Sequence, residues 1–124
     1  MADGSATLAP GGSAEAALAF LTEMSPDLRG AAILGPDGEV LAATGEASRW
    51  REDGAALFAV ADSVEGPVEQ VHVATEQGEV FALRHAGHAA LAVTERFALA
   101  SLMFFDMRST LRELVRGGAG AEAE

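Results

Sequence analysis

The stretch Gly30-Ala31-Ala32-Ile33-Leu34-Gly35-Pro36-Asp37-Gly38-Glu39-Val40-Leu41-Ala42-Ala43-Thr44 decides the fold. It holds two apolar runs, residues 30–35 and 39–44, separated by Pro36-Asp37-Gly38. Proline sets φ at the first turn position and glycine accepts a positive φ, so these three residues favour a tight hairpin turn. The first run is apolar on both faces, which is typical of a strand that is covered on both sides. We therefore expect a hairpin whose first strand lies at the centre of a sheet.

Three more strands are expected further along the chain. Residues 69–76, 79–84 and 89–94 have strand character and are separated by turns that contain glycine. Run 89–94 is apolar on both faces, whereas run 69–76 alternates only in part and carries glutamate and glutamine at its ends. We therefore place strand 89–94 beside strand 30–35 at the centre of the sheet, and strand 69–76 at an edge.

Three helices are expected around these strands. The first covers residues 13–24, with the serine at its start as the cap and the following Ser-Pro pair as the stop. The second begins between residues 48 and 53 and ends near residue 64, before Gly66-Pro67. The third covers about residues 97–115, and Gly117-Gly118 closes it.

The predicted fold class is α/β (α+β), with the element order α-β-β-α-β-β-β-α. The five strands form an antiparallel sheet in the order 2-1-5-4-3, with the first and third helices on one face and the second helix on the other. We expect one domain over residues 13–116. Residues 1–12 are predicted to be a disordered N-terminal segment, and residues 117–124 a disordered acidic tail.

Composition excludes several classes of function. The chain has no cysteine, which removes disulfides and thiolate metal sites. Its formal net charge is −11, and phosphate binding needs clustered cations, so we expect no nucleic acid partner. The same charge argues against an anionic membrane surface. No signal-peptide pattern and no run of about 18 apolar residues occurs, so we expect no membrane insertion and a cytoplasmic location.

Sequence patterns of known catalytic sites are absent. The chain contains no G-x-S-x-G, no phosphate loop that ends in Gly-Lys-Ser/Thr, no G-x-G-x-x-G and no H-E-x-x-H. No serine or threonine stands beside an evident base. We therefore expect that the protein is not an enzyme and has neither catalytic residues nor a cofactor.

The three histidines have no assigned role. His85 and His88 bracket the Ala86-Gly87 turn, and His72 lies on the expected edge strand. A metal site needs three or four converging ligands, so we expect no metal here and interpret the turn histidines as solvated. His72 at a dimer seam could act as a proton switch, and its role stays open.

The second helix carries more apolar residues than one buried face requires. One stripe of this helix can lie on the sheet and consists of Trp50, Leu57, Ala61 and Val64, whereas Phe58 lies off that stripe. Either the helix is buried in the core of a monomer, or it has a second contact face against a partner helix.

The neighbouring edge strand 69–76 lacks lysine and proline, the residues that usually protect an edge strand from pairing. Together the two elements predict a symmetric homodimer. The predicted interface residues are Leu57, Phe58, Ala61, Val71 and Val73.

Arginines recur every four residues on the third helix, at Arg108, Arg112 and Arg116. One interpretation is a solvated face, since cations near a helix C-terminus interact favourably with its dipole. The other is a docking site for an acidic partner surface. Both interpretations stay open.

Three stretches resemble the roadblock family, which comprises the dynein light-chain roadblock and its bacterial relatives. They are residues 29–45, residues 68–76, and residues 91–100 together with 111–114. The resemblance spans about residues 14–115. It implies a five-stranded profilin- or longin-like fold, and homodimers or heterodimers joined through the second helix and the third strand. It also implies action beside small Ras-like GTPases, as a regulator or scaffold.

Two hypotheses about function follow. The first is a non-enzymatic dimeric adaptor or regulator that acts with a small Ras-like GTPase. The alternative is a small-ligand sensor domain of the related α/β type, with a pocket between sheet and helix.

Overall fold

The computed structural model describes residues 13–123. The expected N-terminal segment, residues 1–12, and the last residue lie outside this range. The elements follow the predicted order and are α1 (Ala14–Met24), β2 (Leu28–Leu34), β3 (Val40–Ala43), α2 (Ala47–Glu65), β4 (Gln70–Ala74), β5 (Glu79–His85), β6 (His88–Thr94) and α3 (Ala100–Ala123).

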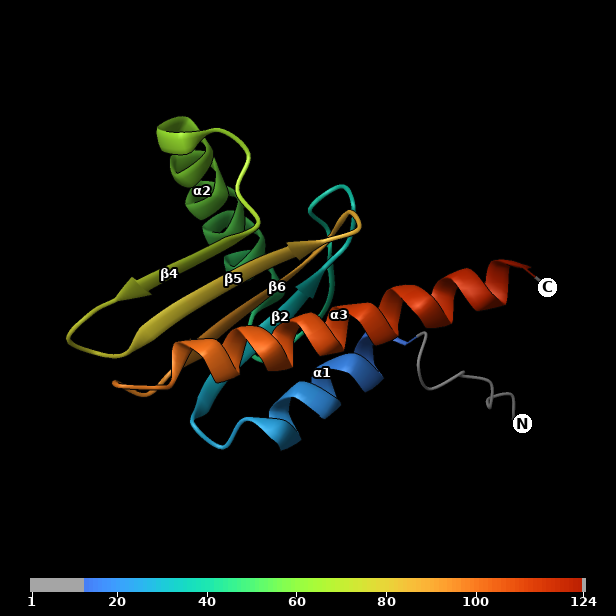
Figure 1. The fold of residues 1–124 in the computed structure, drawn as a ribbon, viewed down its shortest axis with the longest axis horizontal. Helices are drawn as coiled ribbons and strands as arrows, with labels where there is room; N and C mark the ends of the chain where they lie inside the picture. Colours follow the sequence, from blue (N-terminus) through green and yellow to red (C-terminus); the bar gives the residue numbers. More distant parts are fainter. Residues whose placement is uncertain (1–12, 124) are drawn as a thin grey trace.

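The five strands form one antiparallel sheet in the order β3-β2-β6-β5-β4. This confirms the predicted order 2-1-5-4-3, with β2 and β6 adjacent at the centre and β4 at an edge. Both central strands are buried over most of their length, as their two-sided apolar sequences predict. In Figure 1, α1 and α3 lie in front of the sheet and α2 lies behind it. The predicted distribution of the helices is therefore confirmed.

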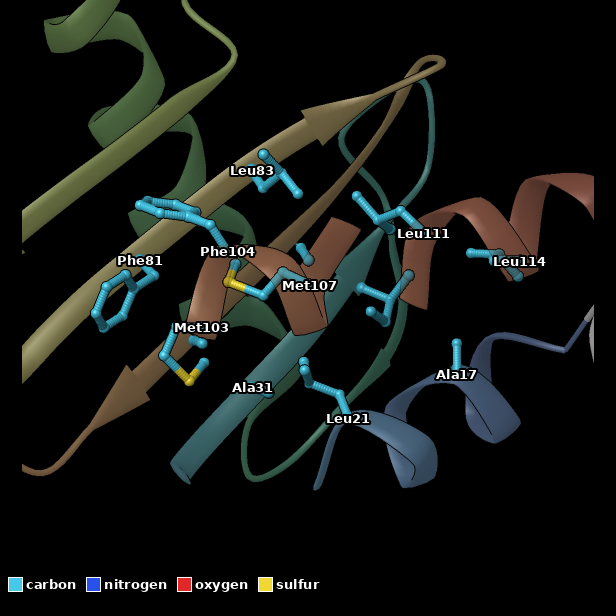
Figure 2. Packing of buried hydrophobic residues seen from close by; sticks show 13 residues of the cluster. Ala17, Leu21, Ala31, Phe81, Leu83, Met103, Phe104, Met107, Leu111 and Leu114 are labelled. Carbon is cyan, nitrogen blue, oxygen red and sulfur yellow. The ribbon is translucent and has the colours of Figure 1, made fainter. Parts of the chain in front are cut away.

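The larger core lies between the sheet and the α1–α3 layer. Phe81 and Leu83 of β5 point toward Met103 and Met107 of α3, and Leu21 of α1 completes the layer (Figure 2). All five are at most 4% exposed. Full burial of one such side chain contributes about 1.5–3 kcal/mol, so this layer is the main source of stability.

The smaller core lies between the sheet and α2. Ala32, Leu34 and Leu91 form its floor, and Phe58 packs onto them from α2. Gly54 allows the helix to come close, because a Cβ atom at this position would lie only 2.8 Å from Cδ1 of Leu91. The close approach of α2 to the sheet therefore depends on a residue without a side chain.

The predicted bounds of the third helix are wrong at both ends. Phe97 has φ +67°, which lies in the left-handed region, so the helix cannot start there and begins at Ala100. At the other end α3 continues through Gly117-Gly118 to Ala123, where a disordered tail was predicted. Each glycine costs about 1 kcal/mol relative to alanine in a helix but does not forbid helical backbone. None of the helices in residues 13–123 combines the length and apolar character needed to cross a membrane.

The turn between β5 and β6 carries a strained alanine. His85 pairs with His88 across a two-residue loop, and both loop residues have positive φ, +52° at Ala86 and +84° at Gly87. Asn-Gly is the favoured pair for such a turn, whereas alanine in left-handed backbone costs roughly 1–2 kcal/mol. We expect Ala86→Asn to raise the free energy of unfolding by about 0.5–1 kcal/mol, measured by urea denaturation. The matched variant Ala86→Val should lower it, and equal values for the two variants would contradict the assigned strain.

Candidate partner interface

The strand β4 is the open edge of the sheet. Within residues 13–123 it pairs as a strand only with β5, with Val71 opposite Ala82 and Val73 opposite Val80. Along its other side, backbone N–H and C=O groups face outward, because successive hydrogen-bonding groups of a strand point to alternate sides. Val73 is 38% exposed. The predicted edge position of β4 is therefore confirmed, and the edge is apolar on the α2 side.

Helix α2 leaves part of the sheet beside it uncovered. A hollow of about 300 Å³, called here the α2 groove, runs between the helix and strands β4 to β6. Val60 and Val64 follow Leu57 at helical spacing on the same flank of α2, and Val60 is 65% exposed. The apolar surface thus extends from the sheet across the groove and onto the helix. The groove is lined by Trp50, Asp53, Gly54, Leu57, Val73, Val80, Leu91 and Val93.

Phe58 lies inside the monomer. Its side chain is 7% exposed and packs onto the smaller core, and the Arg84 guanidinium stacks over its ring at 3.9 Å from the centroid. The prediction that Phe58 contributes to a dimer contact face does not fit this burial. Leu57 and Ala61, by contrast, are half-buried. Val64 was predicted to lie on the sheet but is exposed.

An ion pair holds the end of α2 to β5. Arg84 donates two hydrogen bonds of 3.0 Å to the carboxylate of Asp62, and the backbone N–H of Val68 donates a third to the same group. The bond from Arg84, above all, holds the pKa of the Asp62 carboxyl below its ordinary value. Beyond this pair lies a cleft of about 910 Å³ between α2 and the two hairpin turns, called here the hairpin cleft.

A buried carboxylate joins β4 to the loop before α3. Glu79 is 7% exposed, and its Oε1 lies 2.6 Å from Nε2 of His72. Its Oε2 accepts the backbone N–H of Phe97 at 2.5 Å. The contact with His72, followed by that with Phe97, lowers the pKa of the Glu79 carboxyl, although burial acts in the opposite direction. The His72 ring also stacks on Phe81, with 4.4 Å between the ring centroids.

These two carboxyls make stability depend on acid pH. The pKa values of Asp62 and Glu79 are lowered from ordinary values of 3.8 and 4.5, so their contribution to folding is present above about pH 4.5. It is lost as the pH falls through the folded-state pKa values. We expect the free energy of unfolding to fall below about pH 4.5, measured by urea denaturation. Glu79→Gln should flatten that fall, whereas Glu76→Gln, at an exposed turn residue, should not. Identical slopes for the two variants would contradict this assignment.

The three arginines of α3 do not form one surface. Arg108 donates to the side chain of Gln70 on β4 at 3.1 Å and lines the hairpin cleft. Arg112 is exposed, and Arg116 forms an exposed ion pair with Glu113 at 2.6 Å. Only Arg112 and Arg116 therefore lie on the outer face of the helix, and the docking role of the set stays a prediction.

The turn histidines line the hairpin cleft. His85 and His88 lie beside the Ala86-Gly87 turn, as the sequence indicates. Across residues 13–123, no group of three histidine, aspartate or glutamate side chains is placed to hold a metal ion.

Comparisons with known proteins identify the fold. A Roadblock/LC7 domain from Streptomyces avermitilis superimposes with a TM-score of 0.68 at 20% identity, covering 81% of this chain and 92% of that domain. An MglB protein solved with a tetrameric arrangement gives a TM-score of 0.66 at 19% identity, covering 91% and 93%. The chain has a roadblock fold. No protein-family model and no curated protein matches the sequence.

The roadblock fold belongs to a wider group of similar architectures. LokiProfilin2, solved in complex with rabbit actin, gives a TM-score of 0.58 at 15% identity, covering 82% of this chain and 95% of that one. The resemblance predicted from the sequence is therefore confirmed at the level of the fold, including its profilin-like character. The Streptomyces domain in this comparison comes from a bacterium.

Sequence reasoning missed the linked set His72, Glu79 and Phe97. Glu79 and Phe97 are 18 residues apart and belong to no known motif. The one available signal was a glutamate directly before the four apolar residues 80–83 of the strand.

Proposed function

We propose that this chain is a bacterial member of the roadblock family and acts as a homodimeric, non-enzymatic adaptor or regulator of a small Ras-like GTPase in the cytoplasm. The observation that carries the proposal is the open β4 edge beside the apolar α2 groove. An exposed strand edge invites pairing with another strand, and natural proteins usually guard or cover it.

A second copy fits this surface well. Two β4 strands related by a two-fold axis pair antiparallel, which extends the sheet across both molecules. The same axis brings the flank of α2 that carries Val60 and Val64 against the partner. Leu57, Val71 and Val73 then lie at or beside the contact between the two copies, called here the seam. Phe58 stays in the core of each monomer and packs between α2 and the sheet.

The role as a regulator rests on family resemblance and on the kind of proteins that share the fold. The neighbours are Roadblock/LC7 domains and MglB proteins, one of them solved as a tetramer, so self-association occurs in this structural group. The absence of recognisable catalytic motifs in the sequence supports a binding role rather than a chemical one.

Sedimentation velocity over a dilution series tests the dimer. We expect twice the mass of one chain at micromolar concentration, with dissociation on dilution. A monomer at every concentration would overturn the dimeric part of the proposal. The regulatory part is tested by adding the protein to a Ras-like GTPase of the same organism and measuring binding to each nucleotide state, GTP hydrolysis and nucleotide exchange. No binding in either the GDP-bound or the GTP-bound state would overturn that part.

The hairpin cleft favours a second candidate function, a small-ligand sensor. Its size, about 910 Å³, lies within the range of ligand sites, and the ring of Phe58 and the guanidinium of Arg51 offer both apolar and polar contacts. A thermal-shift screen of small metabolites discriminates the two functions. A ligand that raises the melting temperature, with the effect lost in Arg51→Ala, supports the sensor.

A further inference from the structure

A row of apolar side chains is exposed where the loop after β6 enters α3. This row, called here the α3 ridge, consists of Phe97 (81% exposed), Leu99 (65%), Leu102 (52%) and Phe105 (62%). The last three are spaced by three residues, and the carbonyl of Leu99 already accepts a helical hydrogen bond from Met103, so they are neighbours along one stripe. With about 200 Å² for a phenylalanine and somewhat less for a leucine, the ridge exposes on the order of 450 Å². Apolar patches of this size on monomers are often functional.

The first residue of the ridge is held in place by the fold. Phe97 adopts φ +67°, a strained value for a bulky residue. Its backbone N–H is bound by the buried carboxylate of Glu79, whose other oxygen contacts His72. The Arg96 guanidinium lies over its ring, 4.6 Å from the centroid. The fold thus uses a buried charged group to keep a strained backbone while the aromatic ring remains in solvent.

The ridge continues into a basic surface along the same helix. After Phe105, the outer face of α3 carries Ser109, Arg112 and Arg116, at the helical spacing that follows from Leu102. The distance from residue 102 to residue 116 along the axis is about 21 Å at 1.5 Å per residue. One half of this face is therefore apolar, and the other half carries the exposed Arg112 and the Arg116–Glu113 ion pair, on a chain whose net charge is −11.

We propose that the outer face of α3 binds an amphipathic helix of a partner protein. The partner helix places apolar side chains on the α3 ridge and carboxylates against Arg112 and Arg116. A net charge of −11 disfavours an anionic lipid surface as the occupant. A second copy does not complement this face, because an antiparallel pairing of two α3 helices places the arginines of each copy on the apolar ridge of the other, and a parallel pairing places the arginines against one another. The surface belongs to the helix layer on the face of the sheet opposite to α2, whereas the proposed dimer seam uses the α2 side of β4 (Figure 1).

A designed peptide provides the probe. It is a helix of about 18 residues, the length that spans this face, with leucines along one stripe of one half and glutamates in the other half. Binding is measured by fluorescence anisotropy and mapped by two-dimensional NMR on the full chain. We expect a Kd in the range of tens of micromolar that weakens with salt, and shifts concentrated in residues 97–116.

Exposed-residue variants keep the proposal falsifiable. Phe105→Ser should raise the Kd at least about tenfold, and Arg112→Glu should raise it several-fold and reduce its salt dependence. Ala59→Ser, at an exposed alanine on α2 away from both the α3 ridge and the proposed dimer seam, is the control and should leave the Kd unchanged. Because all three side chains lie in solvent, the melting temperature should stay close to that of the parent protein.

Four results would overturn the proposal. The first is NMR shifts confined to the hairpin cleft, and the second is equal binding of a peptide in which lysines replace the glutamates. The third is binding to phosphatidylserine vesicles that Phe105→Ser abolishes. The fourth is a lower mass of the free Phe105→Ser protein than of the parent protein. The last result would assign the ridge to a second copy. A monomeric parent protein would contradict the proposed dimer and leave this inference intact.

Discussion

Replacing Phe58 with alanine is expected to lower the free energy of unfolding by about 3 kcal/mol or more. The side chain is 7% exposed and fills the space between α2 and the floor formed by Ala32, Leu34 and Leu91. Its removal leaves a cavity and also takes away the ring beneath Arg84. Urea denaturation at two protein concentrations measures the loss and separates it from any change in association.

The matched control for this prediction lies on the same helix. Val60→Ala removes an apolar side chain that is 65% exposed in the monomer, and at high dilution its effect on unfolding should stay within about 0.5 kcal/mol. If Phe58→Ala left stability unchanged and only dissociated the protein, Phe58 would be an interface residue after all. The burial seen here would then not describe the dimer.

The double variant Val60→Asp/Val73→Asp is expected to weaken the dimer at least about 100-fold, which corresponds to about 2.7 kcal/mol. A two-fold axis brings the carboxylates of both copies into one apolar seam, where unpaired charges are costly to bury. Both valines are exposed in the monomer, so each chain should still fold. Sedimentation velocity measures the mass of the protein in solution, and circular dichroism checks that each variant is folded.

Ala59→Asp is the control for charge alone. Ala59 is exposed on the flank of α2 that lines the hairpin cleft, away from the α2 groove. This variant should remain a dimer with nearly the parental dissociation constant. Dissociation by Ala59→Asp as well would show that added charge, rather than the seam, separates the copies.

The sheet was predictable because its signals are local. Pro36-Asp37-Gly38 forms its turn with Gly38 at φ +81°, and Ala86-Gly87 closes the last hairpin with two positive φ values. The two-sided apolar runs at 30–35 and 89–94 are sufficient to place β2 and β6 together at the centre. Turn chemistry and burial pattern thus determine strand order without long-range information.

The orientation of α2 was not predictable from its apolar stripe. The pattern alone places Trp50, Leu57, Ala61 and Val64 toward the sheet. In the structure, Gly54 lets the backbone approach Leu91, and the helix turns so that its Phe58 side faces the sheet while Val64 faces solvent. Trp50 and Leu57 still pack beside this core, so the glycine shifts the stripe rather than reversing it, and its contact Leu91 lies in a distant strand.

The start of α3 was not predicted correctly, again because a contact between distant residues determines it. Phe97 and Leu99 continue the apolar periodicity of the helix, so the sequence favours an earlier start. The hydrogen bond from Phe97 to Glu79 stabilises a left-handed backbone there instead. That contact joins the start of β5 to the loop after β6, and its two residues are 18 apart in the sequence, so no pattern of neighbouring residues predicts it.

The unguarded rim of β4 has a consequence for how this protein must be handled in the cell and in the laboratory. A solitary chain presents a ready template for uncontrolled strand addition, so aggregation competes with correct assembly whenever copies are made faster than they pair. Substitutions that keep the chain single without placing charge on this rim should therefore give insoluble material. Val73→Asp differs from them because it introduces a gatekeeper at the same position where it blocks assembly.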